Sequence, residues 1–304
     1  MFHCKVKGFI LISALCRTKM NYVNLSSQNF VYMAITENKK SRTLVNLIGV
    51  PSLLFVMWQG GYWFVGVFTA LILLSALELS DLARQQKGNP LTWLLMIGIM
   101  GLISANLCDG AVDKISVLMG VGLLSLCIEM FRGEDKPLLN MATVNFGMIW
   151  LGLLLGSLIS VRLIPEHGFI ITVAMFVSVW TCDTFAFIVG SKFGKTKVLP
   201  LVSPKKSWEG SISGLVGAIL FMLILFYNGV FQGWLSLTDV IFIGFITGGL
   251  SQLGDFAESL LKREAGVKDT SDYLQGHGGI LDRFDSLAIA APLTYLYLQY
   301  MNLI

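Results

Sequence analysis

Long apolar runs separated by short polar stretches fill the sequence from about residue 43 to its end. A bilayer core requires roughly 20 predominantly apolar residues in one helix. We therefore predict an all-α polytopic membrane protein with about nine transmembrane helices. They lie at approximately residues 43–58, 62–79, 91–107, 115–131, 143–163, 168–190, 211–231, 237–256 and 286–303.

The basic residues predict how these helices are oriented, because cytoplasmic loops of membrane proteins are enriched in Lys and Arg. With the N-terminus in the cytoplasm, 20 of the 22 basic residues fall on that side, and only Lys114 and Arg162 fall outside. One helix more or fewer would exchange the sides of every later loop. The pattern therefore favours nine helices, with a cytoplasmic N-terminus and the C-terminus outside.

Composition agrees with a membrane protein. The chain is 55% hydrophobic and 13% charged, whereas a soluble protein carries about 25% charged residues. A water-soluble fold of this composition would expose large apolar areas, so a soluble enzyme and a disordered chain are excluded. The five cysteines are scattered without a CxxC pair, which indicates neither a disulfide framework nor a zinc site.

Residues 1–42 fit the membrane pattern poorly. Their apolar stretch at 8–16 is too short to span a bilayer. We interpret residues 1–42 as a leader or cytoplasmic tail, with a misassigned start as the alternative for part of it. Residues 43–304 form the membrane-embedded domain in this interpretation.

The first of two longer polar segments, 191–210, follows Asp183, an acid near the end of the sixth apolar run. An ionised acid at such a position costs on the order of 3 kcal/mol unless it is paired or hydrated, so it indicates function. The segment continues as SPKKSWEG, with Lys205 and Lys206 adjacent. Ser207 and Glu209 are suited to begin the next helix as its cap and first-turn acid. The alternatives are a packing role for Asp183 and topology anchoring for the lysines.

The second polar segment lies at 257–285, after the eighth apolar run. On a helix, Asp255, Ser259, Lys262 and Arg263 would share one face. Glycines allow backbone amides to approach an anion closely, and two acids in one helical turn offer the hard oxygen ligands that magnesium prefers. A lone histidine is more often a structural hydrogen-bonding residue. The candidates that follow the helix are Lys268, His277, Gly278, Gly279, Asp282, Arg283 and Asp285.

The charges of these segments nearly cancel. Residues 191–210 carry a net charge of +4, residues 255–285 carry −3, and Asp183 adds one negative charge. Lysines in a neutral, acid-rich site bind a polyphosphate only when the carboxylates hold divalent cations. The segments therefore predict a metal-dependent phosphoryl or nucleotidyl transfer site.

The polar segments resemble the phosphatidate cytidylyltransferase family, also called CDP-diacylglycerol synthase. The stretch SLLKREAGVKDTSDYLQGHGGILDRFD, residues 259–285, is similar to the family signature, and WTCDTFAFIVGSKFG and SPKKSWEG resemble its upstream segments. The resemblance covers approximately residues 43–304. Gln275 departs from it, because the family usually has proline there.

The resemblance implies transfer of a cytidylyl group from CTP to phosphatidate, giving CDP-diacylglycerol and pyrophosphate. It also implies magnesium at a two-metal site whose second metal is unidentified. The expected partners are CTP, phosphatidate and the bilayer, with no nucleic acid, and a homodimer is expected. The expected location is a bacterial inner membrane, with the active site facing the cytoplasm.

We assign roles on this basis as hypotheses. The predicted catalytic residues are Asp255, Lys262, Arg263, Asp282 and Asp285, and the predicted metal ligands are Asp183, Asp255, Asp282 and Asp285. The predicted substrate-binding residues are Ser203, Lys205, Lys206, Ser259, Lys268, His277, Gly278, Gly279 and Arg283. The alternatives are a CTP-dependent lipid kinase, a related CDP-lipid synthase, and a transporter of phosphorylated metabolites. A transporter would place its charges near the bilayer midplane between repeated halves, a pattern that this sequence lacks.

Overall fold

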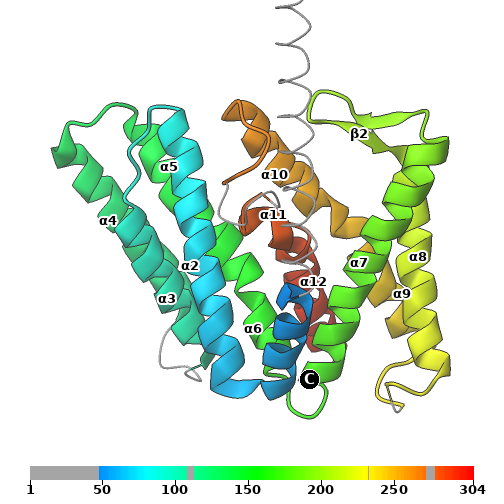
Figure 1. Cartoon of the computed structure of the whole chain (residues 1–304). Coiled ribbons are helices and arrows are strands. Elements are labelled where there is room, and N and C mark those ends of the chain that lie inside the picture. Colours follow the sequence, from blue (N-terminus) through cyan, green and yellow to red (C-terminus); the bar gives the residue numbers. More distant parts are fainter. Residues whose placement is uncertain (1–47, 108–112, 232, 272–277) are drawn as a thin grey trace, which may run out of the picture. The chain divides into compact units, whose positions relative to one another are not determined.

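The computed structural model describes residues 48–107, 113–231, 233–271 and 278–304. Contacts within the chain divide it into two units. The second unit comprises Pro51–Leu274 and Gly278–Ile304 and holds all the elements labelled in Figure 1. The predictions for residues 1–42, Gln275 and His277 lie outside the described residues.

The second unit is mostly helical, as predicted, with one short antiparallel hairpin between strands β1 and β2. Its helices, two of them π-helices (η), and its strands are α2 (Gly61–Gln85), α3 (Thr92–Leu107), α4 (Lys114–Arg132), α5 (Pro137–Gly147), η1 (Met148–Leu155), α6 (Ser157–Arg162), α7 (Gly168–Phe193), β1 (Lys197–Leu199), β2 (Ser203–Ser207), α8 (Trp208–Tyr227), α9 (Leu237–Phe245), η2 (Ile246–Leu250), α10 (Gln252–Glu264), α11 (Leu281–Phe284) and α12 (Leu287–Tyr300).

Each predicted apolar run coincides, in its described part, with a helix or a continuous helical stretch. Within the described ranges, six helices are long and apolar enough to cross a membrane, which confirms a helical membrane protein. The other three runs form shorter helices: Ile48–Gln59, Thr92–Leu107 and Leu287–Tyr300. Nine crossings and the orientation stay predictions.

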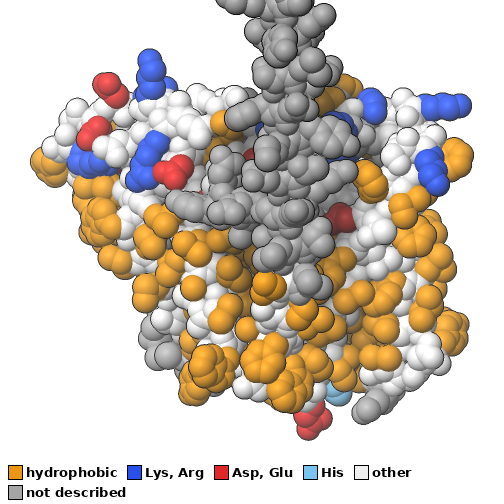
Figure 2. Space-filling view, in the orientation of Figure 1, with side chains coloured by type: hydrophobic (Ala, Val, Ile, Leu, Met, Phe, Trp, Pro, Cys, Tyr) orange, Lys and Arg blue, Asp and Glu red, His pale blue; other side chains and the backbone are white. Residues whose placement is uncertain are grey.

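The loops and turns that connect the helices of the second unit lie at its two opposite ends. The loops α2–α3 and α4–α5, the hairpin and the last turn of α10 lie at one end, and the turns α6–α7 and α8–α9 lie at the other (Figure 1). On the face drawn in Figure 2, Lys and Arg side chains gather at the first end, whereas apolar side chains cover the flanks. This separation is the one expected when one end meets an aqueous compartment and the flanks meet lipid.

Glycines bring α7 and α8 close together beside the hairpin. A Cβ added to Gly210 would lie 2.8 Å from the Ala186 carbonyl oxygen, and one added to Gly214 would lie 2.8 Å from that of Cys182. Larger residues would force the helices apart. The hairpin joins this helix pair and is therefore held at a fixed place above it.

The helical stretch that leads to the second polar segment contains a π-helical turn. The Ser251 amide donates to the carbonyl of Ile246 at 2.9 Å, five residues earlier. Thr247, within this turn, meets Ser178 of α7 with 2.7 Å between their hydroxyl oxygens. Such a turn holds one extra residue and rotates the helix that follows it. The predicted span 237–256 thus contains a π-helical turn, and the helix continues beyond the span as α10 to Glu264.

Three aromatic rings connect α11 to the bundle. Phe284 packs edge-on against Phe68 of α2, with 5.9 Å between ring centroids, and against Phe176 of α7 at 6.4 Å. Edge-to-face contacts of this length are favourable. They fix α11, which carries Asp282, relative to α2 and α7.

Candidate active site

The hairpin ends in the capped start of α8, as predicted. The Ser207 hydroxyl accepts a hydrogen bond from the Gly210 amide at 3.3 Å. The Glu209 carboxylate accepts one from the Thr196 amide at 3.1 Å, which ties the two ends of the hairpin together. These contacts fix the strand that presents Lys205 and Lys206.

A cavity of about 600 Å³ opens beside this strand, between α7, α8 and α10. Asp183, Lys205, Lys206 and Asp255 line it, so four predicted site residues from three separate elements come together. The Lys206 ammonium group pairs with the Asp255 carboxylate. It also lies 4.5 Å from the centre of the Phe256 ring, where a cation is attracted to the aromatic face.

A second ionic cluster lies about two turns further along α10, around Lys262. The Lys262 ammonium group is 2.5 Å from Asp282 Oδ1 and 3.4 Å from Glu258 Oε1. The Lys262, Asp282 and Glu258 side chains are 12%, 7% and 0% exposed. Ion pairs buried this deeply are screened little by solvent, so this cluster is more strongly coupled than the half-exposed Lys206–Asp255 pair.

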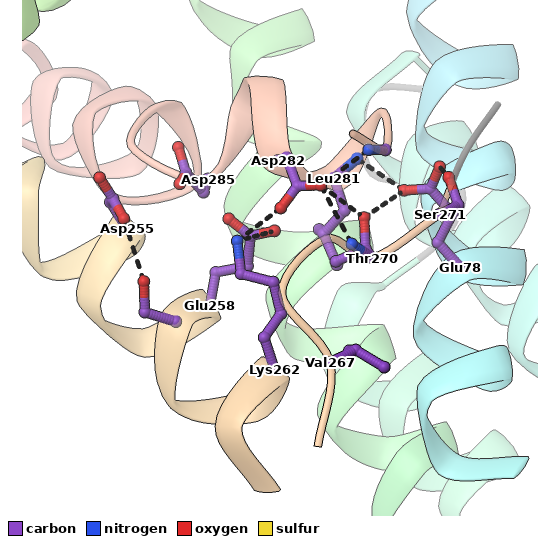
Figure 3. A network of polar contacts seen from close by, with 12 residues as sticks. Glu78, Asp255, Glu258, Lys262, Val267, Thr270, Ser271, Leu281, Asp282 and Asp285 are labelled. Atoms are coloured by element: carbon purple, nitrogen blue, oxygen red, sulfur yellow. Dashed lines mark hydrogen bonds and ion pairs between the residues drawn. The ribbon is translucent and has the colours of Figure 1, made fainter. Parts of the chain in front are cut away.

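Asp282 is enclosed by donors. Its Oδ2 accepts hydrogen bonds from the Gly279 amide at 2.7 Å, the Thr270 amide at 3.1 Å and the Thr270 hydroxyl at 3.0 Å (Figure 3). Burial alone would raise the pKa of Asp282. The neighbouring Glu258 and Lys262 side chains and the Gly279 amide outweigh burial and hold the pKa of Asp282 well below its usual value.

Asp285, one turn after Asp282, differs from it. Burial, followed by the charge of Asp255, raises the pKa of Asp285 to about 6. Its Oδ1 accepts the amide of Ser286 at 2.5 Å. The pKa values of two acids in one helical turn are thus shifted in opposite directions, which is common where carboxylates have separate chemical roles.

The remaining predicted residues divide into those near the clusters and those away from them. Ser259 donates to Asp255 Oδ1 at 3.3 Å. Arg263 of the same predicted face donates to the Val202 carbonyl at 3.2 Å, at the hairpin whose Lys206 pairs with Asp255. A helix turns by about 100° per residue, so adjacent Lys262 and Arg263 point to different elements. Ser203 lies at the start of β2, half-buried, and Lys268 and Arg283 are exposed.

Gly278 and Gly279 of the signature lie close to the carboxylates of Asp282 and Glu78, where a side chain would not fit. Gly278 has a φ of +77°, and a Cβ there would lie 2.6 Å from Asp282 Oδ2. A Cβ on Gly279 would lie 1.9 Å from the Thr270 hydroxyl and 2.5 Å from Glu78 Oε2. The anion that the Gly279 amide contacts is the Asp282 carboxylate.

Sequence reasoning missed three residues that build this site: Glu78, Glu258 and Thr270. Glu78 and Glu258 are fully buried, and both Glu258 oxygens lack a hydrogen bond. The signal that identified Asp183, an acid in an apolar helical run, applies to Glu78 in the second run as well. Thr270 has no comparable signal, because a threonine in a polar loop is ordinary.

The fold and the site define a helical membrane protein with paired ammonium and carboxylate groups at one end of its helices. The model of the cytidylyltransferase family matches residues 40–301, and the chain belongs to that family. It is therefore an enzyme, and the predicted resemblance to phosphatidate cytidylyltransferases is confirmed.

Three relatives named phosphatidate cytidylyltransferase illustrate the similarity. The protein of Haemophilus influenzae is 46% identical over 136 residues, which are 44% of this chain and 47% of that protein. The protein of Thermotoga maritima is 26% identical over 273 residues, covering 88% of this chain and 98% of its own length. The protein of Brucella suis is 30% identical over 266 residues, covering 86% and 93%.

Proposed function

We propose that this enzyme transfers the cytidylyl group of CTP to phosphatidate, giving CDP-diacylglycerol and pyrophosphate. The names of its relatives support these substrates. The observation that carries the proposal is the cavity lined by Lys205, Lys206 and Asp255. It offers cations for phosphate groups and lies beside apolar helices that suit a lipid substrate.

In the proposed reaction, a phosphate oxygen of phosphatidate attacks the α-phosphorus of CTP. The new P–O bond forms as the bond between the α-phosphorus and the bridging oxygen to the β-phosphate breaks, and pyrophosphate leaves with that oxygen. The lipid phosphate is already an anionic nucleophile, so no side chain needs to form a covalent intermediate. The protein's task is to position the two anions and stabilise the charge that develops.

We assign each residue of the site a role according to whether it lies in the cavity, in the buried cluster or around them. Lys205 and Lys206, with Ser203, would bind the triphosphate in the cavity. Lys262 would neutralise charge at the buried cluster, and Ser259 would hydrogen-bond a phosphate oxygen. Arg263, Lys268, His277, the two glycines and Arg283 remain proposed substrate contacts around these centres.

A divalent cation fits the chemistry of the carboxylates. The two Glu258 oxygens are buried without hydrogen bonds, which is an environment that a cation would satisfy. Asp183, Asp255 and Asp285 supply further hard oxygen ligands of the kind magnesium prefers. Asp282 is occupied by Lys262 and three backbone or hydroxyl donors. Within the described ranges, no three His, Cys, Asp or Glu residues are arranged as a finished metal site.

We propose Mg²⁺ as the cation, with Asp255, Asp282, Asp285 and Asp183 as its candidate ligands and Glu258 beside them. The ammonium groups of Lys206 and Lys262 now contact these carboxylates. They would have to release part of these ion pairs for the carboxylates to bind a cation. When bound, the cation would neutralise phosphate charge and polarise the reacting phosphoryl group. The proposal includes a second metal at the same site and a homodimer. It also places the enzyme in a bacterial inner membrane, with the site facing the cytoplasm.

Reconstituted enzyme given CTP and phosphatidate tests the function. We expect release of pyrophosphate and a lipid product that keeps CMP, with activity lost on chelation by EDTA and restored by Mg²⁺. Label from the α-phosphate of CTP should enter the lipid. Entry of only the γ-phosphate label would indicate a lipid kinase instead.

Asp282→Asn tests the assignment of the buried cluster, and we expect a loss of about 100-fold in kcat, the scale of a lost electrostatic contact in a transition state. Asp113→Asn is the matched control, because Asp113 caps α4 away from the site and asparagine is an equally good cap. Wild-type activity in the Asp282→Asn enzyme would refute the role of this carboxylate.

A further inference from the structure

Glu78 of α2 is a fully buried acid whose described partners are all donors. The Ser271 hydroxyl and the Ile280 amide donate to its Oε1 at 2.5 and 2.9 Å. The Leu281 amide and the Thr270 hydroxyl donate to its Oε2 at 2.8 and 3.2 Å. The side chain is 0% exposed, so these four contacts replace the water that a carboxylate otherwise requires.

These donors come from both described edges of the signature loop. Thr270 and Ser271 precede the undescribed residues, and Ile280 and Leu281 follow them at the start of α11 (Figure 3). One side chain of α2 therefore holds two points of the chain that are ten residues apart. Gly279 completes the closure, since a Cβ there would collide with Glu78 and Thr270.

The same loop orients Asp282. The Thr270 hydroxyl oxygen lies 3.2 Å from Glu78 Oε2 and 3.0 Å from Asp282 Oδ2, so it stands between two carboxylates. A hydroxyl has one proton and donates to one of them at a time. The amides of Thr270 and Gly279 complete the contacts to Asp282. The position of Asp282 thus depends on backbone that Glu78 holds in place.

We propose that Glu78 is a positioning residue, which clamps the loop so that Asp282 faces Lys262 and the reacting phosphates. This inference rests on the proposed function. Residues that orient a reactive group through hydrogen bonds typically contribute 10- to 100-fold to activity. Glu78 lies outside the cavity, so its loss should lower kcat by this factor while the KM for CTP changes by less than about threefold.

Glu78→Gln tests the clamp, because glutamine keeps the shape but turns an NH2 group toward two of the four donors. Glu129→Gln is the matched control. Glu129 of α4 is also a buried acid, 6% exposed, and accepts from Arg132 and Asn140 without touching the loop. A structural defect common to both variants would lower their melting temperatures alike.

Two readouts separate the clamp from general stability and from the proposed function. Hydrogen exchange at the amides of Ile280 and Leu281 should speed up at least tenfold in Glu78→Gln and stay unchanged in Glu129→Gln, whatever reaction the enzyme catalyses. The kcat should fall only in Glu78→Gln. Faster exchange with unchanged kcat, or equal losses in the two variants, would overturn the proposal.

Thr270 provides a test that does not depend on folding of the Glu78 variant. Thr270→Ser keeps the shared hydroxyl and should keep kcat within about twofold of wild type, whereas Thr270→Val should lose about tenfold. Equal activity of the two would overturn the proposal. Wild-type protein that is inactive with CTP and phosphatidate would refute the proposed function, and hydrogen exchange alone would then decide the clamp.

Discussion

Replacing Lys262 by methionine tests whether the more buried of the two ionic clusters contributes more to the stability of the protein. Lys262 faces Glu258 and Asp282, whose side chains are 0% and 7% exposed. Removing one partner of a buried ion pair typically costs 3–5 kcal/mol, because the remaining charge is left without compensation. Asp282 would keep three backbone or hydroxyl donors, whereas Glu258 has no hydrogen bond. Burial raises the pKa of Glu258, so without Lys262 this acid would be left with no polar partner whether it is charged or takes up a proton, and we expect most of the cost to come from it.

Lys206→Met is the matched comparison. The Lys206 and Asp255 side chains are 28% and 30% exposed, and partly exposed pairs contribute about 0–1 kcal/mol. At about 2–4 °C per kcal/mol, Lys262→Met should lower the melting temperature in detergent by on the order of 10 °C, and Lys206→Met by a few degrees at most.

The double variant Lys262→Met/Glu258→Gln identifies the source of the cost. Replacing both partners should recover at least half of the lost stability, since the buried acid that lost its cation is gone. A Lys262→Met protein as stable as Lys206→Met would refute the reasoning from burial. Failure of the double variant to recover stability would show that Lys262 acts through its packing or through Asp282.

Two further substitutions test the loop and the hairpin. Gly279→Ala places a Cβ 1.9 Å from the Thr270 hydroxyl, so we expect a loss of about 1–3 kcal/mol in stability and a fall in kcat. Gly120→Ala of α4 meets nothing within 4 Å and should lower neither stability nor kcat, since alanine favours a helix more than glycine does; equal melting curves for the two variants would contradict the predicted collision. Arg263→Met removes the exposed side chain that holds the Val202 carbonyl, so melting should shift within about 0.5 kcal/mol while the KM for CTP rises. An unchanged KM would show that the hairpin keeps its place without Arg263.

The sequence predicted those parts of the fold that depend on local patterns. Apolar runs locate helices because each residue's transfer to lipid depends mainly on its own side chain. Ser207 and Glu209 begin α8 as expected, because capping involves residues within one turn. Lys206 and Asp255 were both predicted to be in the site, but their pairing joins residues 49 positions apart and came only from the structure.

The features that the sequence did not predict depend on tertiary contacts or on the extra residue of a π-helical turn. The hydrogen bond from Arg263 to the Val202 carbonyl joins residues 61 positions apart, which no local pattern links. Glu78 meets Thr270 and Leu281 from 192 and 203 positions away, and nothing near Glu78 in the chain indicates those partners. The π-helical turn η2 was not predicted either, because it lies inside a continuous apolar run and the extra residue does not interrupt that run.

Helix α10 explains how these separate segments become one site. Asp255 and Lys262 are seven residues apart, which is two turns and roughly 10 Å along a helix, so they project from one face. Asp255 meets Lys206 of the hairpin, and Lys262 meets Asp282 at the start of α11. Each polar segment therefore contributes a partner of opposite charge to the same helix. The charges of the two polar segments, which nearly cancel in the sequence, thus meet in two local ion pairs along α10, the helix that follows the π-helical turn η2.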